Sequence, residues 1–315
     1  MARSHGDAPV LSRRSLLLFG AGASLAVAAP SLALVATRRQ NATPDSQATT
    51  GQLPTSGEPT GSFHFEPPGL RRIPVHYAIG AGDRRTATMV IVMHGDGRNA
   101  ADYRDAWAGL IHDRPVVAVV PEFSQSDFPD SREYNQGGVL DSDGAVRPSA
   151  RWTFSYVEPL FHEMRRRIAG RQTSFDLFGH SAGAQFVHRF VELSPSPLLR
   201  SAVAANAGWY TMPDPAVPFP YGAGGAPSDL FDWAAAFSAR LTVLLGDQDL
   251  LDENLRRDAA ADAQGLTRWE RGHAFFERAR DQAAALGVAF AWQLHEVAGV
   301  GHDYQQMSAA AVDLM

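Results

Sequence analysis

The five residues Gly179-His180-Ser181-Ala182-Gly183 constrain the fold of this chain more than any other part of its sequence. They lie between residues 174–178, an apolar run typical of a short buried strand, and residues 184–193, whose apolar side chains recur at helical spacing. A G-x-S-x-G pentapeptide between a strand and a helix holds its serine in a strained turn, where larger neighbouring side chains would clash. The pattern predicts a nucleophile elbow with Ser181 at its tip. The alternative interpretation is a serine in an ordinary glycine-rich turn.

A serine nucleophile needs a histidine to take its proton and a carboxylate to orient that histidine, and after such an elbow the chain order is Ser, acid, His. The apolar run 241–245 predicts a central parallel strand, and it opens into Gly246-Asp247-Gln248-Asp249. A last strand is predicted over 288–297. The loop after it carries His302 and precedes a short terminal helix. The order predicts His302 as the base and either Asp247 or Asp249 as the acid.

Three other histidines are candidates for structural positions. His273 lies where a helix is expected to start, and His295 lies inside the predicted last strand. His94 follows the apolar run 88–93, which predicts another strand. We expect His273 and His295 to be structural or surface residues, and His94 to pack or hydrogen-bond beneath the loop after its strand.

An acyl-transfer site also needs N–H donors for the oxyanion, usually one from the residue after the nucleophile and one from the loop after an earlier strand. The first predicted donor is the backbone of Ala182. The second is the backbone of Asp96, which follows the strand 88–93, and Gly97 is the alternative. Because the Asp96 carboxylate would oppose the developing negative charge, we expect its side chain to point away and cap the helix predicted from Ala100 onward.

Strand and helix signals alternate along residues 62–315, a length that suits one domain. Further strands are predicted over 116–120 and 201–205, and a helix over 158–169. This alternation predicts an α/β fold with a mostly parallel sheet and helices on both faces. The run Arg165-Arg166-Arg167 near the end of that helix is expected to be a solvated face, where positive charge suits the helix dipole.

Two loops at predicted strand ends are rich in aromatic residues. The first spans 121–138 and the second spans 206–233. The second is too long for a simple connection and predicts either a lid or an acyl-binding wall. Trp209 and Tyr210 lie closest to the strand end and are the predicted substrate-binding residues, which would favour a hydrophobic acyl or aryl ester. The alternative is a proline-stiffened surface loop that packs its own aromatic rings.

The composition removes several chemistries. The chain has no cysteine, and all 28 of its basic residues are arginine, which excludes a cysteine nucleophile, thiolate metal sites, disulfides and lysine chemistry. The acidic turn from Asp247 to Glu253 is not a calcium loop, because Leu251 occupies a ligand position and the required glycine is missing. We therefore predict no metal and no cofactor. A net charge of -6 with no broad basic stretch also argues against nucleic-acid binding.

Taken together, these motifs resemble those of serine hydrolases of the α/β-hydrolase superfamily. The resemblance runs from about Arg71 to the C-terminus and rests on the elbow, on His94-Gly95-Asp96-Gly97, on Gly246-x-x-Asp249 and on Gly301-His302. Within the superfamily, Gly97-Arg98-Asn99 and the nearby Tyr103 resemble a pattern found in exported polyester (polyhydroxybutyrate) depolymerases, feruloyl esterases and related carboxylesterases.

The resemblance implies an α/β-hydrolase fold with a loop-rich lid, and it places the acid at the fourth position of the turn, Asp249. It implies an enzyme that cleaves small or polymeric carboxylic esters through a Ser-His-Asp triad and an acyl-enzyme. A peptidase or amidase on the same fold and a non-catalytic surface binding protein are the alternatives.

The first 61 residues are predicted to form an export signal or anchor followed by a linker. Ser12-Arg13-Arg14-Ser15-Leu16-Leu17 fits a twin-arginine signal and is followed by an apolar region over 16–36. Residues 1–36 are therefore predicted to be either a signal that is cleaved after Ala28 or Ala33 or an uncleaved membrane anchor. Residues 37–61 are rich in Thr, Ser, Pro, Gly and Gln and predict a disordered linker. We expect transport by the twin-arginine machinery and a periplasmic or extracellular location.

Overall fold

The computed structural model describes residue 53, residues 59–251 and residues 253–315. The predicted signal or anchor at 1–36 and most of the predicted linker lie outside the described residues. Within the linker range, Thr60 and Gly61 already belong to the first strand. None of the helices in the described part of the chain is long and apolar enough to cross a membrane.

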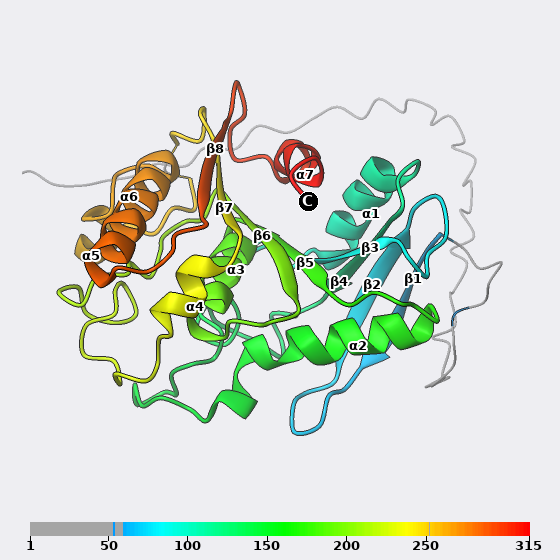
Figure 1. Cartoon of the computed structure of the whole chain (residues 1–315), viewed down its shortest axis with the longest axis horizontal. Helices are drawn as coiled ribbons and strands as arrows, with labels where there is room; N and C mark the ends of the chain where they lie inside the picture. Colours follow the sequence, from blue (N-terminus) through cyan, green and yellow to red (C-terminus); the bar gives the residue numbers. More distant parts are fainter. Residues whose placement is uncertain (1–52, 54–58, 252) are drawn as a thin grey trace, which may run out of the picture. The chain divides into compact units, whose positions relative to one another are not determined.

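The described chain folds around one sheet in the order β1-β2-β4-β3-β5-β6-β7-β8 (Figure 1). The strands are β1 (Thr60–Phe65), β2 (Ile73–Ile79), β3 (Thr88–Met93), β4 (Val116–Pro121), β5 (Phe175–His180), β6 (Leu199–Ala205), β7 (Leu241–Gly246) and β8 (Gln293–Val297). The first two pairings, β1 with β2 and β2 with β4, are antiparallel, and the remaining pairings are parallel. The predicted mostly parallel sheet is confirmed.

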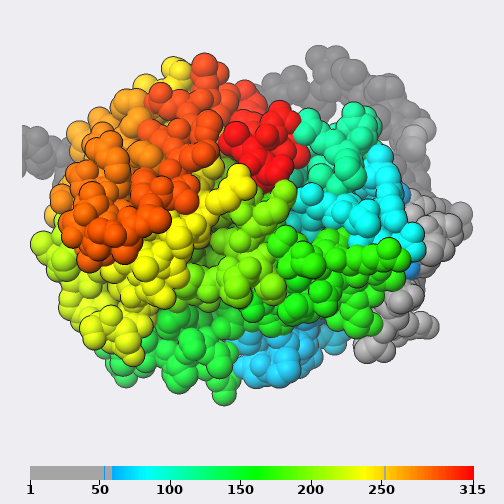
Figure 2. All heavy atoms as spheres, viewed as in Figure 1, coloured from blue at the N-terminus to red at the C-terminus, as the bar shows by residue number. Residues whose placement is uncertain are grey.

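Helices cover both faces of this sheet, as the sequence predicts. One face carries α1 (Ala100–Ile111) and α7 (Tyr304–Val312), and the other carries α2 (Val157–Arg167), α3 (Ala182–Leu193), α4 (Trp233–Ser238) and α6 (Arg268–Leu286) (Figure 1). The short elements are η1 (Ser149–Arg151), η2 (Thr153–Tyr156) and α5 (Ala259–Asp262). In the space-filling view α7, in red, lies beside α1, in teal (Figure 2).

The central strands are buried on both sides because helices cover both faces. In β3, Met89, Ile91 and Met93 pack with the larger hydrophobic cluster, whereas Val90 and Val92 pack with the cluster under α1 and α7. This alternation follows from the period of two in an extended strand. A strand buried in this way reads as a continuous apolar run, which is why the sequence predicts it well.

Two local predictions need correction. The last strand covers only 293–297 of the predicted 288–297, because Gly287 ends α6 in a left-handed conformation and the next residues cross over the core before pairing begins. The arginine run at the end of α2 is not wholly solvated. Arg167 is buried, donates to Glu163 Oε1 at 2.7 Å and places its guanidinium 3.9 Å from the ring centre of Phe63.

Candidate active site

Ser181 lies in the tight turn between β5 and α3, where the sequence predicts a nucleophile elbow. Its φ of 58° and ψ of −114° place a non-glycine residue in a strained region of backbone space. The turn closes only because its flanking residues are glycines. A Cβ on Gly179 would lie 2.2 Å from the carbonyl oxygen of Gly183, and a Cβ on Gly183 would lie 2.1 Å from the carbonyl oxygen of Met93. The structure therefore shows the strained strand-turn-helix geometry that the sequence predicts around Ser181.

The fold brings Ser181, His302 and Asp249 into one chain of contacts. His302 Nε2 lies 3.0 Å from Ser181 Oγ, and His302 Nδ1 lies 2.6 Å from Asp249 Oδ2. The three residues follow β5, β8 and β7, so they meet at the carboxyl edge of the parallel strands, the usual ligand edge of such sheets. Because the carboxylate accepts a hydrogen bond from Nδ1–H, the proton stays on Nδ1 and Nε2 is left as an acceptor for the Ser181 hydroxyl.

The structure separates the two candidate acids. The Asp249 side chain is buried, at 1% exposed, and contacts His302. Asp247 Oδ1 instead accepts the backbone N–H of Gly299 at 2.7 Å, so Asp247 holds the loop that leads to the histidine. The geometry agrees with the acid position that the family resemblance implies.

Arg268 forms a second contact with Asp249. Its Nη1 lies 3.2 Å from Asp249 Oδ1, and both side chains are almost fully buried. The same guanidinium donates to the carbonyl oxygens of Leu251 and Glu253, so it fixes the turn after β7 as well as the carboxylate. Arg268 is not evident from the sequence, because an arginine in a helix, 19 residues beyond Asp249, matches no short motif.

Asn206 joins the turn that carries Asp249 to the loop that carries His302. Its Oδ1 accepts the N–H of Gly246 at 2.8 Å, and its Nδ2 donates to the carbonyl oxygen of Gly301 at 3.0 Å. Its φ is 51°, and asparagine tolerates this left-handed conformation better than most residues. An asparagine directly after a predicted strand is the sequence signal that could have identified it, because asparagine tolerates a left-handed turn there.

The predicted oxyanion donors border the serine. Ala182 is the first residue of α3, where backbone N–H groups have no partner within the helix. A Cβ on Gly95 would lie 3.8 Å from Ser181 Cβ, so the loop containing Asp96 and Gly97 abuts the nucleophile. The expectation that Asp96 caps α1 is wrong. The residue at the start of that helix is Asn99, which makes no capping bond.

His94 supports the loop after β3 from below, as expected. It is fully buried, and its Nε2 accepts the backbone N–H of Phe123 at 3.0 Å. The proton therefore sits on Nδ1, which lies 2.9 Å from the carbonyl oxygen of Gly95. Burial lowers the pKa of His94 to about 4, so the ring is neutral at pH 7. The Tyr134 hydroxyl donates to the His94 carbonyl oxygen at 2.6 Å and completes this support.

His180, inside the pentapeptide, packs beside His302, and the sequence pattern does not reveal this contact. Its ring centre lies 4.5 Å from that of His302, and its Nδ1 lies 3.2 Å from the hydroxyl of Tyr103. Burial, together with the charges of His302 and Arg268, lowers the pKa of His180 well below its usual value. A neutral ring beside His302 adds no positive charge to the site.

The other two histidines lie outside the site. His273 Nε2 is 3.1 Å from Glu296 Oε1, and His295 Nε2 is 3.3 Å from Gln293 Oε1. Both pairs are on exposed parts of α6 and β8. The expectation of structural or surface positions is confirmed for both.

Trp209 and Tyr210 do not present their side chains to a ligand. They are 3% and 0% exposed. Trp209 packs against the guanidinium of Arg189, 4.1 Å from its ring centre, and Tyr210 stacks on Phe275 at 4.4 Å. The prediction that these two residues bind substrate is not supported, because protein groups enclose both rings.

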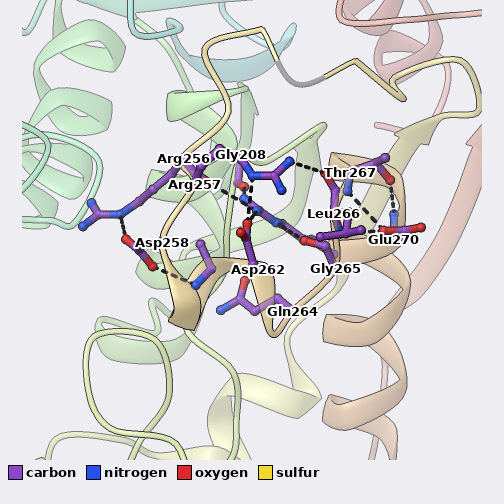
Figure 3. Close-up of polar contacts among 12 residues, drawn as sticks. Gly208, Arg256, Arg257, Asp258, Asp262, Gln264, Gly265, Leu266, Thr267 and Glu270 are labelled. Atoms are coloured by element: carbon purple, nitrogen blue, oxygen red, sulfur yellow. Dashed lines mark hydrogen bonds and ion pairs between the residues drawn. The ribbon is translucent and has the colours of Figure 1, made fainter. Parts of the chain in front are cut away.

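The loop that begins at Asn206 is anchored where it leaves the sheet. Arg271 Nη1 donates to the carbonyl oxygen of Gly208 at 2.7 Å. Gln264 both donates to and accepts from the backbone of Tyr210, at 2.8 and 2.9 Å. Figure 3 shows Gly208 and Gln264 within the polar network around α5. These bonds argue against a lid at this end of the loop. Trp209 also packs against Tyr221 of the same loop, 4.5 Å between ring centres, which fits the alternative of a loop that packs its own aromatic rings.

In the described residues, no group of three or more His, Asp or Glu side chains could hold a metal ion. The site itself combines a strained serine, a histidine that contacts both the serine and a buried carboxylate, and backbone N–H groups at the start of α3. These are the groups that an acyl-transfer reaction requires.

The chain matches no family model and no curated protein. Among solved structures it is similar to poly(aspartic acid) hydrolase-1 from Sphingomonas sp. KT-1, with 40% identity, a TM-score of 0.77, and coverage of 81% of this chain and 97% of that chain. It is also similar to LpqC, a poly(3-hydroxybutyrate) depolymerase from Bordetella parapertussis, with 33% identity, a TM-score of 0.76, and coverage of 81% and 89%. An S-formylglutathione hydrolase from Agrobacterium tumefaciens, at 18% identity, a TM-score of 0.50, and coverage of 81% and 93%, shares the fold alone.

Proposed function

The chain belongs to the α/β-hydrolase superfamily, and we propose that it is an exported serine hydrolase that cleaves carboxylic esters through an acyl-enzyme. The observation that carries the proposal is the continuous contact from Asp249 through His302 to Ser181. Ester chemistry is supported by the similarity to a depolymerase named for a polyester. Export is supported by the twin-arginine pattern at 12–17 and is tested by fractionating cells that produce the full chain.

In the proposed mechanism, Ser181 Oγ attacks the ester carbonyl carbon while His302 Nε2 takes the hydroxyl proton. The N–H groups of Ala182 and Asp96 donate to the oxyanion of the tetrahedral intermediate. The carbon–oxygen bond to the leaving group then breaks, and His302 returns the proton to the departing alkoxide. Asp249 accepts the hydrogen bond from the Nδ1–H group throughout and stabilises the imidazolium. Water then attacks the acyl-enzyme by the same route and releases the acid.

A second candidate function is hydrolysis of amide bonds in poly(aspartic acid). It is favoured by the 40% identity to a protein named for that polymer, over 97% of that protein's length. The triad contacts do not distinguish an ester from an amide, since both react through an acyl-enzyme. Rates on aryl esters and on poly(aspartic acid), measured with the same preparation, separate the two. A non-catalytic binding protein would have no need for the three contacting residues together.

The proposal is tested by intact mass after treatment of the purified protein and its Ser181→Ala variant with a fluorophosphonate. One adduct is expected on the wild type and none on the variant, because only an activated serine reacts. On an aryl ester, Ser181→Ala is expected to lower kcat by about 10⁴-fold or more, with an unchanged melting temperature. Labelling of the Ser181→Ala variant to the wild-type extent would contradict this assignment of the nucleophile.

A further inference from the structure

A pocket of about 310 Å³ lies apart from the residues of the triad. It is formed by the turn before β2 and by the segment between β4 and α2. Its lining includes three arginines, Arg71, Arg147 and Arg151, and a single carboxylate, that of Glu133. In a chain whose net charge is -6, this pocket concentrates positive charge.

The existing contacts of these arginines leave most of that charge uncompensated. Arg71 Nη1 lies 3.1 Å from Glu133 Oε2, and Arg151 Nη1 donates to the backbone carbonyl of Gly69 at 3.0 Å. The guanidinium of Arg147 makes no hydrogen bond or ion pair with any residue that the structure describes. Because a guanidinium matches the two oxygens of a carboxylate, such a pocket suits an anionic ligand better than a neutral one.

The walls of the pocket are held by buried groups. The Tyr156 hydroxyl donates to the carbonyl oxygen of Arg71 at 2.8 Å, and the Tyr156 side chain is almost fully buried. Phe128 is buried too, with the Arg71 guanidinium 5.5 Å from its ring centre. The Thr153 hydroxyl donates to the Glu133 carbonyl oxygen. The arginines therefore project from a supported wall rather than from a free loop.

Three consecutive residues connect this pocket to the active site. Glu133 lines the pocket, and Tyr134 hydrogen-bonds to the carbonyl oxygen of His94 beneath the predicted oxyanion loop. Asn135 Nδ2 donates to Gln185 Oε1 at 2.9 Å, and Gln185 lies one helical turn after Ser181 in α3. The pocket and the nucleophile are thus separated by a short stretch of the same supporting segment.

The sheet topology shows on which edge the pocket lies and how many strands separate β2 from the strand that carries Ser181. β2 begins beside the end of β4, since Val75 pairs with Pro121, so the turn before β2 lies at the carboxyl edge where Ser181 lies. In the strand order β2-β4-β3-β5, three strand spacings separate β2 from the strand that carries the elbow. At about 4.8 Å per spacing, β2 and β5 are roughly 14 Å apart across the sheet. A ligand that occupies both sites must be an extended chain.

We propose that this arginine pocket binds a carboxylate group of an acidic oligomer or polymer whose scissile bond lies at Ser181. The inference rests on the proposed function and deepens it, because it assigns the substrate to the class of carboxylate-bearing chains. The burial of Trp209 and Tyr210 is consistent with this class, since the two rings predicted to favour a hydrophobic substrate are enclosed by protein.

The test measures binding without turnover. Fluorescein-labelled poly(aspartic acid) is titrated with the Ser181→Ala protein at low salt, and fluorescence anisotropy is recorded. Adding Arg147→Gln or Arg151→Gln is expected to weaken binding by about tenfold each, as for loss of one charged hydrogen-bonding partner. The matched control is Arg280→Gln, at an exposed position on α6 where the guanidinium pairs with Asp281, and it should leave the affinity unchanged. Melting temperatures measured by circular dichroism verify that each variant is folded.

Equal affinities for all variants, or no binding by the Ser181→Ala parent, would overturn the pocket assignment. The same result follows if a labelled uncharged polymer binds as tightly as poly(aspartic acid). These binding results do not test the proposed serine hydrolase chemistry. That proposal fails if the wild-type protein does not react with the fluorophosphonate.

Discussion

Gly183 is the position where a single methyl group tests how the elbow is built. A Cβ there would lie 2.1 Å from the carbonyl oxygen of Met93, 2.7 Å from its carbonyl carbon and 2.8 Å from the carbonyl oxygen of His94. All three are backbone atoms, so no side chain can rotate away to make room. Since non-bonded heavy atoms prefer separations of about 3.5 Å or more, Gly183→Ala requires α3 and β3 to separate by roughly 1 Å.

The cost has two parts. Overpacking of a well-packed core costs about 1–3 kcal/mol, and the contact with three backbone atoms places Gly183→Ala near 3 kcal/mol. Ser181 stands at the start of α3 and shifts with the helix, and a misplacement of about 1 Å lowers the rate by about 100-fold. Urea denaturation measures the stability, and kcat/KM on an aryl ester measures the rate.

Gly109 provides the matched control. It lies in α1, and a Cβ there would meet nothing within 4 Å. Gly109→Ala is expected to leave activity unchanged and to raise the free energy of unfolding by about 0.5–1 kcal/mol, because glycine is unfavourable within a helix. If Gly183→Ala unfolded at the wild-type urea concentration and retained wild-type kcat/KM, the close-approach argument would be refuted.

Two further predictions concern buried groups around the site. Arg268→Met is expected to lower kcat for an aryl ester about tenfold with little change in KM, because Arg268 positions Asp249 rather than the substrate. Arg268→Lys should recover part of the lost kcat. A change in KM alone would contradict this role. His94 has a pKa of about 4 when folded and 6.5 as its ordinary value, so below pH 6.5 the unfolded state binds a proton that the folded state excludes. This residue should therefore lower the free energy of unfolding by about 2.5 kcal/mol between pH 7 and pH 4.5. Urea denaturation of His94→Gln at the two pH values should show a smaller decrease. An identical decrease in the variant would show that His94 is not its source.

Much of the fold was predictable because its signals are local. The apolar runs of β3, β4, β5 and β7 are continuous since both faces of these strands are covered, and the elbow needs its glycines within five residues of one another. The meeting of side chains from separate strand ends was also predictable, from the geometry of a parallel sheet. Parallel strands deliver their C-terminal loops to one edge, so Ser181 and His302 could be expected to meet although 121 residues separate them.

Predictions failed where side-chain surroundings depend on distant segments. An aromatic residue after a strand reads the same whether it faces a ligand or the core. Trp209 and Tyr210 are buried because Arg189 of α3 and Phe275 of α6 pack against them. Arg167 reads as a surface residue at a helix end, but β1 places Phe63 beneath its guanidinium.

The sequence by itself determined the class of the sheet, the strained serine turn and the order of the residues that meet at the carboxyl edge, since each depends on periodicity or on steric limits within a few residues. The tertiary structure alone decided what each side chain contacts. It brought Asp249 rather than Asp247 to His302, placed Arg268 behind that carboxylate, and gathered the arginines of residues 71, 147 and 151 around one pocket. The physical reason is that hydrogen bonds and ion pairs act over a few ångströms, whereas strand order sets which remote segments come that close.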